Sequence, residues 1–227
     1  MKKLTVLLAA ALLFAGATSA LAEIKVAGSA SVGVFSDYIW RGGNYTGDAN
    51  MVVQPSVTIG TGGFSVNWWG NVNENTGEMD EVDVTLDYTK DLGALKVSVG
   101  NILYNVDGIS DTNEVYLAVA PTTLPLDVKL TYFYDYDEFE VSYLTLALGK
   151  TMAIADKTSF SLGAAAGYND FDFLQNAELS ASLAYALNDQ IAITPSVLYS
   201  TPLSDDAEDL LGLDDEFVAG LTVGLAF

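Results

Sequence analysis

The chain ends in Ala219-Gly220-Leu221-Thr222-Val223-Gly224-Leu225-Ala226-Phe227, a stretch in which larger apolar residues alternate with small or polar ones. In an extended strand the two sets fall on opposite faces, as they do in a barrel strand that contacts lipid outside and the lumen inside. We expect the aromatic Phe227 to act as the signal that the barrel assembly machinery reads. The stretch therefore predicts a β-barrel of a Gram-negative outer membrane, with a soluble secreted β-protein as the alternative.

The opposite end of the chain has the pattern of a cleavable export signal. Two lysines precede the apolar residues 4–16, and Ala20-Leu21-Ala22 forms a small-x-small cleavage site. We expect residues 1–22 to be removed after export through the Sec pathway and residues 23–227 to form a single barrel domain. No later apolar run approaches the roughly 20 residues of a spanning helix, so a membrane protein of this sequence has to be a closed barrel.

Composition excludes several classes of function. The chain has 30 acidic and 9 basic residues and a net charge of −21. This disfavours a nucleic-acid partner, because such binding depends on Lys and Arg neutralising phosphates. The chain contains no cysteine and no histidine, so disulfides, thiolate metal sites and histidine-based catalysis are excluded. Outer-membrane barrel hydrolases pair Ser or Glu with His, and we therefore expect neither an enzyme nor a bound cofactor.

The two-residue period of the sequence predicts twelve strands, and an even number is typical of bacterial single-chain barrels. Their ranges are residues 24–41, 51–60, 63–73, 80–89, 94–104, 113–120, 126–136, 138–150, 158–169, 177–187, 190–200 and 216–227. We expect an all-β, transmembrane, antiparallel up-and-down barrel with both termini on the periplasmic side. Within residues 138–150 the apolar phase shifts between Tyr143 and Leu144, which predicts a β-bulge or an apolar patch facing inward. The connection before it, Tyr136-Asp137-Glu138, is expected to be a tight outer turn.

Charged residues support this topology because they divide between the two ends of the expected barrel. Lysines fall at periplasmic strand ends or turns, namely Lys25, Lys90, Lys96, Lys129, Lys150 and Lys157. Most acids fall at the outer end, with the densest run in residues 205–216. We interpret that run as a solvated loop that divalent cations bridge to anionic lipopolysaccharide, without the spacing of an EF-hand. Its candidates for a metal site are Asp205, Asp206, Glu208, Asp209, Asp214 and Asp215.

The inward side of the expected strands is polar and mostly negative, which favours cations over anions. The candidates for lining the lumen or its constriction are Asp37, Arg41, Trp69, Asp83, Asp87, Glu114 and Lys129. Arg41 is the only arginine of the chain, and strand parity places it inward with Asp37. It is either a constriction or ligand-binding residue, or one half of an internal salt bridge that closes the barrel. The neighbouring Tyr38 and Trp40 are expected to face lipid at the outer interface.

The segment Ser36-Asp37-Tyr38-Ile39-Trp40-Arg41-Gly42 is similar to the N-terminal signature of the Gcw_chp-type family of uncharacterised proteobacterial outer-membrane proteins. The similarity continues through Val53-Gln54-Pro55-Ser56-Val57-Thr58, Trp69-Gly70-Asn71, Asp83-Val84-Thr85-Leu86-Asp87-Tyr88, Glu114-Val115-Tyr116 and Thr194-Pro195-Ser196-Val197-Leu198-Tyr199-Ser200. After Arg41 the run Gly42-Gly43-Asn44-Tyr45-Thr46-Gly47 departs from the family pattern, so no loop function is carried over. The resemblance implies an outer-membrane barrel and brings no substrate with it.

Twelve strands lie between the filled barrels of about 8 strands and the open porins of about 16, which predicts a narrow lumen. The first hypothesis is therefore a narrow, cation-preferring channel or small-solute porin-like protein. The second is a plugged structural or surface-interaction barrel whose acidic outer loops bind divalent cations. In both, the expected surroundings are outer-membrane lipid and lipopolysaccharide.

Overall fold

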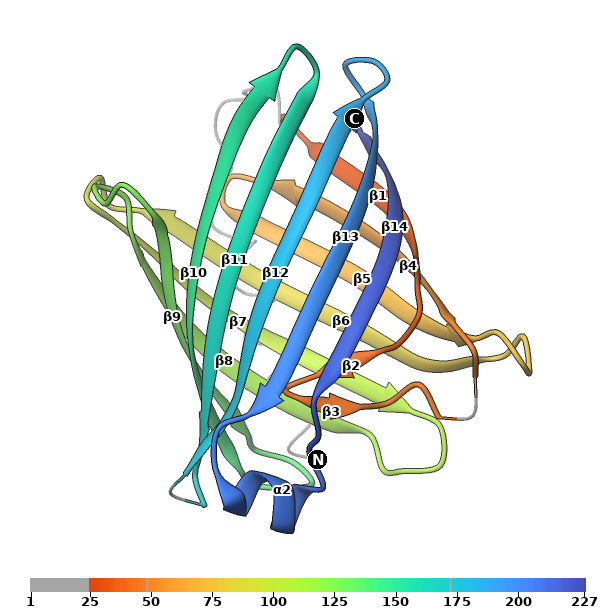
Figure 1. Ribbon diagram of the computed structural model, residues 1–227. Helices are drawn as coiled ribbons and strands as arrows, with labels where there is room; N and C mark the ends of the chain where they lie inside the picture. Colours follow the sequence, from red (N-terminus) through yellow and green to blue (C-terminus); the bar gives the residue numbers. More distant parts are fainter. Residues whose placement is uncertain (1–24, 48, 172) are drawn as a thin grey trace.

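The structure, a computed structural model, describes residues 25–47, 49–171 and 173–227. Within these residues twelve antiparallel strands close into one barrel, in which neighbours along the chain are neighbours in the sheet (Figure 1). The strands are β1 (Ala27–Phe35), β4 (Val52–Thr61), β5 (Phe64–Asn73), β6 (Met79–Asp91), β7 (Leu95–Val106), β8 (Thr112–Pro121), β9 (Asp127–Asp135), β10 (Ser142–Ala155), β11 (Thr158–Asn169), β12 (Leu174–Ala186), β13 (Ile191–Pro202) and β14 (Glu216–Ala226). The twelve-stranded up-and-down barrel predicted from the sequence is confirmed. In the described part of the chain, no helix is long and apolar enough to cross a bilayer.

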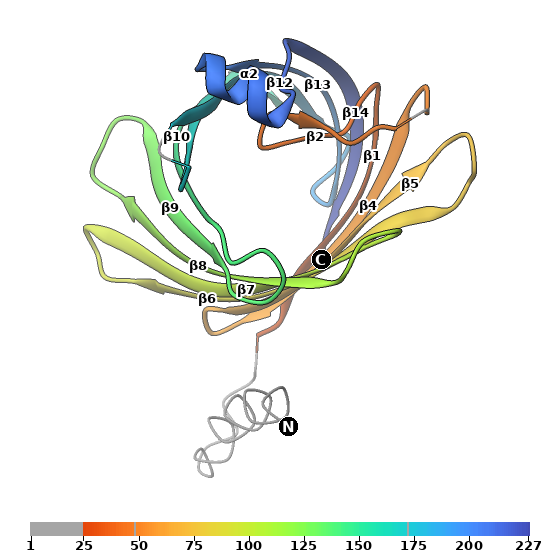
Figure 2. The same ribbon diagram turned by 90° about the horizontal axis from the view of Figure 1, so that it is seen from below.

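The barrel closes where the first strand meets the last. β1 pairs with β14, from Ser29 opposite Ala226 to Phe35 opposite Gly220, and with β4 on its other side. Viewed from below, the strands surround one central axis (Figure 2). Closure leaves no free sheet edge, so the strands satisfy one another's backbone hydrogen bonds without help from water.

The strands carry apolar side chains outward and mainly small or polar ones inward. The outward residues Leu179, Leu86 and Val32 are 59%, 50% and 48% exposed. On the inner face the Phe35 ring lies against Gly220, in the space that a Cβ atom at this glycine would need. An exposed apolar wall of this kind indicates that the barrel is surrounded by an apolar medium.

The two ends of the barrel differ in their connections and in charge. Short connections such as residues 62–63 and 156–157 lie at the end that carries the C-terminus (Figure 1). Lys157 lies in one of these turns. Lys96 lies opposite Asp91 in the strand register, next to the short turn between β6 and β7. We call this the turn end, and the opposite end, with the longer and more acidic connections, the loop end.

A helix lies at the loop end, where the sequence predicts a solvated loop. It is α2 (Asp205–Leu211), drawn in blue below the barrel in Figure 1. The Ser204 hydroxyl accepts a hydrogen bond from the Ala207 amide at 3.2 Å, and Gly212 ends the helix at a φ of 65°. Ala207 is fully buried in a small apolar cluster. The acidic run is therefore a capped helix that packs on the barrel.

The first predicted strand, residues 24–41, is wrong in its second half. β1 ends at Phe35, and the chain then turns inward instead of continuing along the wall. Tyr38 and Trp40 consequently lie inside the barrel, against Trp69 and Tyr104, and do not face lipid. Their apolar alternation continued the pattern of β1, which is why the period alone could not reveal the turn.

The predicted strand 138–150 is also displaced, because β10 covers Ser142–Ala155. Residues 136–141 form a longer connection than the expected tight turn. The Asp135 carboxylate holds this connection by accepting two of its backbone amides at 3.0 and 3.3 Å. The change of apolar phase is not a β-bulge, because the register of β10 with both neighbours is continuous at Tyr143 and Leu144 and shifts only at residues 153–155. Tyr143 is buried against Phe133 inside the barrel, which corresponds to the inward apolar patch among the two alternatives.

Candidate functional site

A short hairpin folds into the lumen between β1 and β4. It consists of β2 (Ile39–Trp40) and β3 (Gly43–Asn44), which are joined by Arg41 and Gly42. These two residues have φ angles of 51° and 86°, the positive values that two-residue hairpin turns require. A positive φ is unfavourable for arginine, and such strain is concentrated at functional positions. We call residues 36–46 the lumen hairpin.

Aromatic rings hold the lumen hairpin against the barrel wall. Tyr38 packs on Trp69 of β5 with 5.4 Å between ring centroids, and Trp40 packs on Tyr104 of β7 with 5.9 Å. The Tyr45 ring lies 5.9 Å from the rings of both Tyr38 and Trp40. These five rings link the hairpin to two strands on one side of the lumen.

Arg41 extends from the tip of the hairpin to the wall at β8, the strand next to β7. Its Nη1 and Nη2 atoms donate to Oε1 and Oε2 of Glu114 on β8, at 2.7 and 2.8 Å. The guanidinium carbon also lies 4.3, 4.8 and 4.4 Å from the ring centroids of Trp40, Phe133 and Tyr143. The two charged side chains are only 13% and 4% exposed. This is a largely desolvated, bidentate ion pair inside an aromatic frame.

Two further hydrogen bonds fix the position of this ion pair. The Tyr104 hydroxyl donates to Oε2 of Glu114 at 2.8 Å. Nε2 of Gln175, on β12, donates to the carbonyl oxygen of Arg41 at 2.8 Å. The lumen hairpin thus contacts strands from β5 round to β12, and it narrows the lumen near the loop end (Figure 1).

Other carboxylates line the lumen without a cationic partner among the described residues. Asp87 accepts from the Tyr116 hydroxyl at 2.6 Å and from the Thr89 hydroxyl at 2.8 Å. Glu178 accepts from a side-chain amide of β12 at 3.0 Å. Oδ1 of Asp83 is buried and has no hydrogen-bond partner in the described part of the chain. Among the described residues, it is the one carboxylate oxygen that is both buried and without a hydrogen-bond partner.

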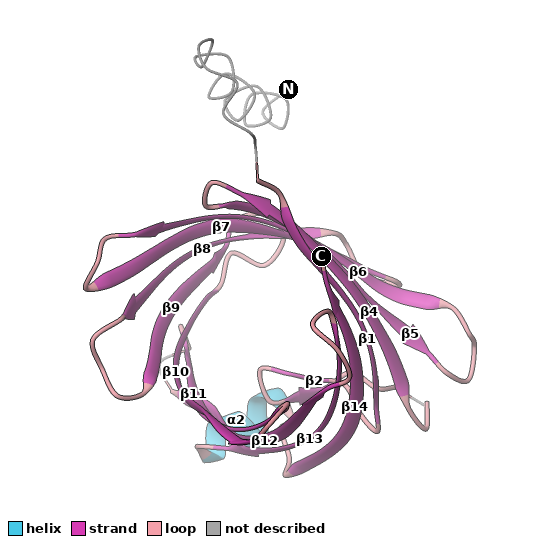
Figure 3. Ribbon diagram, turned by 90° about the horizontal axis from the view of Figure 1, so that it is seen from above, coloured by secondary structure: helices cyan, strands magenta, loops and turns pink. Residues whose placement is uncertain are grey.

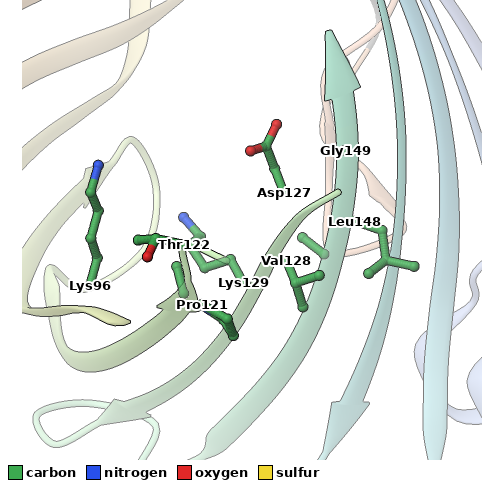
Figure 4. Close-up of a pocket in the computed structure, with 10 residues that line it drawn as sticks. Lys96, Pro121, Thr122, Asp127, Val128, Lys129, Leu148 and Gly149 are labelled. Atoms are coloured by element: carbon green, nitrogen blue, oxygen red, sulfur yellow. The ribbon is translucent and has the colours of Figure 1, made fainter. Parts of the chain in front are cut away.

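A hollow of about 520 Å³ lies at the turn end of the lumen. Figure 4 shows Lys96 from β7 with Lys129 and Asp127 from β9 around it. These residues are separate from the ion pair at the loop end, because Lys129 pairs with Ala147 near the start of β9 while Glu114 lies opposite Asp135 at its end. The two mouths of the barrel thus present lysines at one end and mainly carboxylates at the other.

The structure brings some of the sequence candidates together and separates others. Arg41 and Glu114 form the ion pair, which corresponds to the internal salt bridge among the two alternatives. Trp69 lies directly opposite Asp83 across β5 and β6, beneath the lumen hairpin. Asp37 lies in the connection between β1 and β2. Asp87 lies further along β6, and Lys129 lies at the turn end.

Four residues of the site were not predicted from the sequence, namely Tyr38, Trp40, Tyr143 and Gln175. Trp40 and Tyr143 lie against the Arg41 guanidinium, Gln175 binds the Arg41 carbonyl oxygen, and Tyr38 packs the hairpin on the wall. The run Gly42-Gly43-Asn44 carried a hairpin signal that could have placed Tyr38 and Trp40 inside. No local pattern marks Tyr143 or Gln175, because they meet Arg41 only through the closed barrel.

The acids considered for metal binding do not form a coordination site. No group of three carboxylates among the described residues could hold a metal ion. Four of them are spread along α2, while Asp215 accepts from the Thr201 hydroxyl at 2.6 Å and Asp214 accepts from the Asp215 amide at 2.8 Å. These contacts serve the local fold of the connection.

The twelve strands form one closed barrel (Figure 3). Together with the apolar outer wall and the charged lumen, this architecture defines a porin-like β-barrel. The chain belongs to the Gcw_chp family, described as bacterial proteins of unknown function, whose sequence profile matches residues 19–191. This confirms the resemblance found in the sequence.

Solved structures of two porins share the fold. The NanC porin superposes with a TM-score of 0.60 and 14% identity, over 88% of this chain and 98% of its own. The KdgM porin superposes with a TM-score of 0.59 and 11% identity, over 88% of this chain and 99% of its own. At such identities the likeness establishes the architecture alone. A comparison with curated proteins found no match.

Proposed function

We propose that the protein is a narrow outer-membrane channel that admits small solutes and prefers cations. The porin-like fold and the exposed apolar wall support an outer-membrane location. In this proposal the turn end faces the periplasm, Phe227 is the signal for the barrel assembly machinery, and the loop end meets lipopolysaccharide. The proposed activity is passage through the lumen, without catalysis.

The observation that carries the cation preference is the imbalance of charge around the lumen hairpin. Glu114 neutralises the guanidinium of Arg41, whereas Asp87 and Glu178 have no cationic partner among the described residues. A solute that passes the hairpin therefore meets a negative wall surrounded by a low-dielectric medium. Such a wall attracts cations and repels anions.

Recordings from planar bilayers test the proposal directly. The purified, folded barrel in a tenfold KCl gradient should give unitary currents whose reversal potential has the sign of K⁺ over Cl⁻. The preference should weaken as salt approaches about 1 M, where the Debye length falls to about 3 Å. A reversal potential of the Cl⁻ sign, or a folded barrel without conductance, would overturn the proposal.

A second candidate is a plugged structural or surface-interaction barrel whose acidic connections bind divalent cations. The contacts of the lumen hairpin with strands from β5 to β12 favour it, because they fill part of the lumen. Deleting residues 202–214 should then change the sensitivity of cells to chelators while leaving membrane insertion intact. Unchanged sensitivity would count against this candidate.

A further inference from the structure

A cavity of about 170 Å³ lies between the lumen hairpin and the wall at the loop end. Five aromatic side chains line it, those of Tyr38, Trp40, Tyr45, Tyr104 and Phe139. Pockets for drug-sized ligands usually measure roughly 300–1,000 Å³, so this cavity suits a molecule of only a few non-hydrogen atoms. Residues of the outer connections, including Ile109 and Phe139, complete its rim.

The rings surround the cavity instead of stacking on one another. Trp40 makes edge contacts with Tyr45 and Tyr104, at interplanar angles of 73° and 68°. Tyr38 and Tyr45 are inclined at 47°. Rings that meet at such angles present faces and edges from several directions, as in the aromatic cages that hold alkylated ammonium groups.

The charges around the cavity are mainly negative. Three carboxylates line it, from Glu81, Glu114 and Asp135, against the single guanidinium of Arg41. Glu114 is committed to Arg41, and Asp135 is committed to the Thr112 hydroxyl and two backbone amides. Glu81 therefore supplies the negative charge that remains for a ligand.

The Tyr38 side chain and the Glu81 carboxylate lie beside each other at this cavity. Burial and the nearby carboxylate raise the pKa of Tyr38 above its ordinary value, so this hydroxyl keeps its proton. The ring of Trp40 already accepts one cation, because the Arg41 guanidinium carbon lies 4.3 Å from its centroid. The contact between Arg41 and Trp40 shows that the rings of this site can hold a cation.

We propose that this cavity binds a small organic cation of the alkylated ammonium class, with its methyl groups against Tyr38, Trp40 and Tyr45 and its charge balanced by Glu81. A bare metal ion requires several oxygen ligands, whereas this cavity offers mostly ring surface. The inference rests on the proposed channel function, because it names the class of solute that the lumen would admit.

Titration of the detergent-solubilised full barrel with tetramethylammonium chloride tests the proposal by calorimetry. We expect saturable binding that is about tenfold weaker in Tyr45→Leu and in Glu81→Gln. Tyr45 is 53% exposed, so its replacement leaves the barrel wall intact. Tyr45→Phe, which restores the ring, should restore most of the binding. Glu208→Gln removes one charge from α2, outside the cavity, and should bind like the parent protein.

The outcomes separate this inference from the proposed function. Absence of saturable binding, equal affinities in all variants, or equal binding of the uncharged tert-butanol would overturn the organic-cation site. The same samples report the K⁺ over Cl⁻ preference from their reversal potential. If the K⁺ preference is retained but tetramethylammonium does not bind, the organic-cation site is overturned and the channel is not. If tetramethylammonium binds but the barrel does not conduct, the organic-cation site is supported and the channel is overturned.

Discussion

Arg41 and Glu114 are 73 residues apart in the chain, yet their side chains meet through two parallel hydrogen bonds of 2.7 and 2.8 Å. The pair joins the lumen hairpin to the barrel wall, and both side chains are largely hidden from water. Removing one partner leaves the other charge desolvated and uncompensated, which costs more than removing both. The pair therefore links the stability of the barrel to the charge of its lumen.

Glu114→Gln should lower both stability and cation preference. The substitution leaves the Arg41 charge unbalanced in the lumen, at an expected cost of about 3–5 kcal/mol in the free energy of unfolding. Thermal unfolding and the reversal potential in a KCl gradient measure the two effects. The double variant Arg41→Met/Glu114→Gln should recover most of the stability. If Glu114→Gln has the parent's reversal potential, the pair does not set the charge of the pathway.

Asp87→Asn should reduce the cation preference by about twofold, because it removes a lumen charge that has no cationic partner among the described residues. It should also destabilise the barrel, since Asp87 accepts from Tyr116 and Thr89. Asp83→Asn is the matched comparison, because its Oδ1 atom is buried and has no hydrogen-bond partner among the described residues, so the substitution breaks no hydrogen bond at this oxygen and should change the cation preference less. Reversal potentials and melting temperatures of both variants decide the point. A larger loss of selectivity in Asp83→Asn than in Asp87→Asn would show that cations approach Asp83 instead.

Gly220→Ala should destabilise the barrel, and Gly224→Ala should not. Both glycines face inward on β14, but a Cβ atom at Gly220 would meet the Phe35 ring whereas one at Gly224 meets nothing within 4 Å. Overpacking of this kind costs about 1–3 kcal/mol. Heat-modifiable gel mobility and urea unfolding in detergent compare the two variants. Equal stability of the two variants would show that the Phe35 ring can move aside without a loss of free energy of unfolding.

Ser204→Ala should loosen α2 without affecting the barrel. The Ser204 hydroxyl caps the helix through the Ala207 amide, and loss of such a cap costs about 1 kcal/mol. Proteolysis within residues 203–215 should therefore become faster, while the heat-modifiable mobility of the barrel stays the same. Asp209→Asn, on the same helix but outside the cap, is the control. Unchanged proteolysis in Ser204→Ala would show that packing of Ala207 alone holds the helix.

Most of the wall could be predicted from the sequence because each strand pairs with its neighbour along the chain. The two-residue period predicts the strands around Leu86, Leu130 and Leu179. Short connections between these strands were then enough to predict that neighbours along the chain pair as antiparallel hairpins. The helix α2 was missed for a different reason. Its signals, Ser204 before an acidic first turn and Gly212 after the last, are local, but the density of charge was taken as a sign of solvation.

The core of the candidate site could not be predicted in the same way. Arg41 was assigned to the lumen by strand parity, although it reaches the lumen from the tip of a hairpin. Its partners Glu114, Tyr143 and Gln175 lie on three different strands, and only the closed barrel brings them together. The two-residue period of the sequence predicts that Glu114 faces the lumen. It cannot predict that Glu114 pairs with Arg41, because this pairing depends on contacts between distant parts of the chain.

The lumen hairpin also determines the order in which the molecule can be completed. It follows directly after β1, the first strand to be made, yet its side chain and backbone partners are separated from it by 73 and 134 residues. Contacts between such distant parts of a chain form late, because the intervening loop must first be closed. An assembling barrel therefore has a wider and less selective interior until β12 is in place, and the last strands to be added complete the narrow passage as well as the wall.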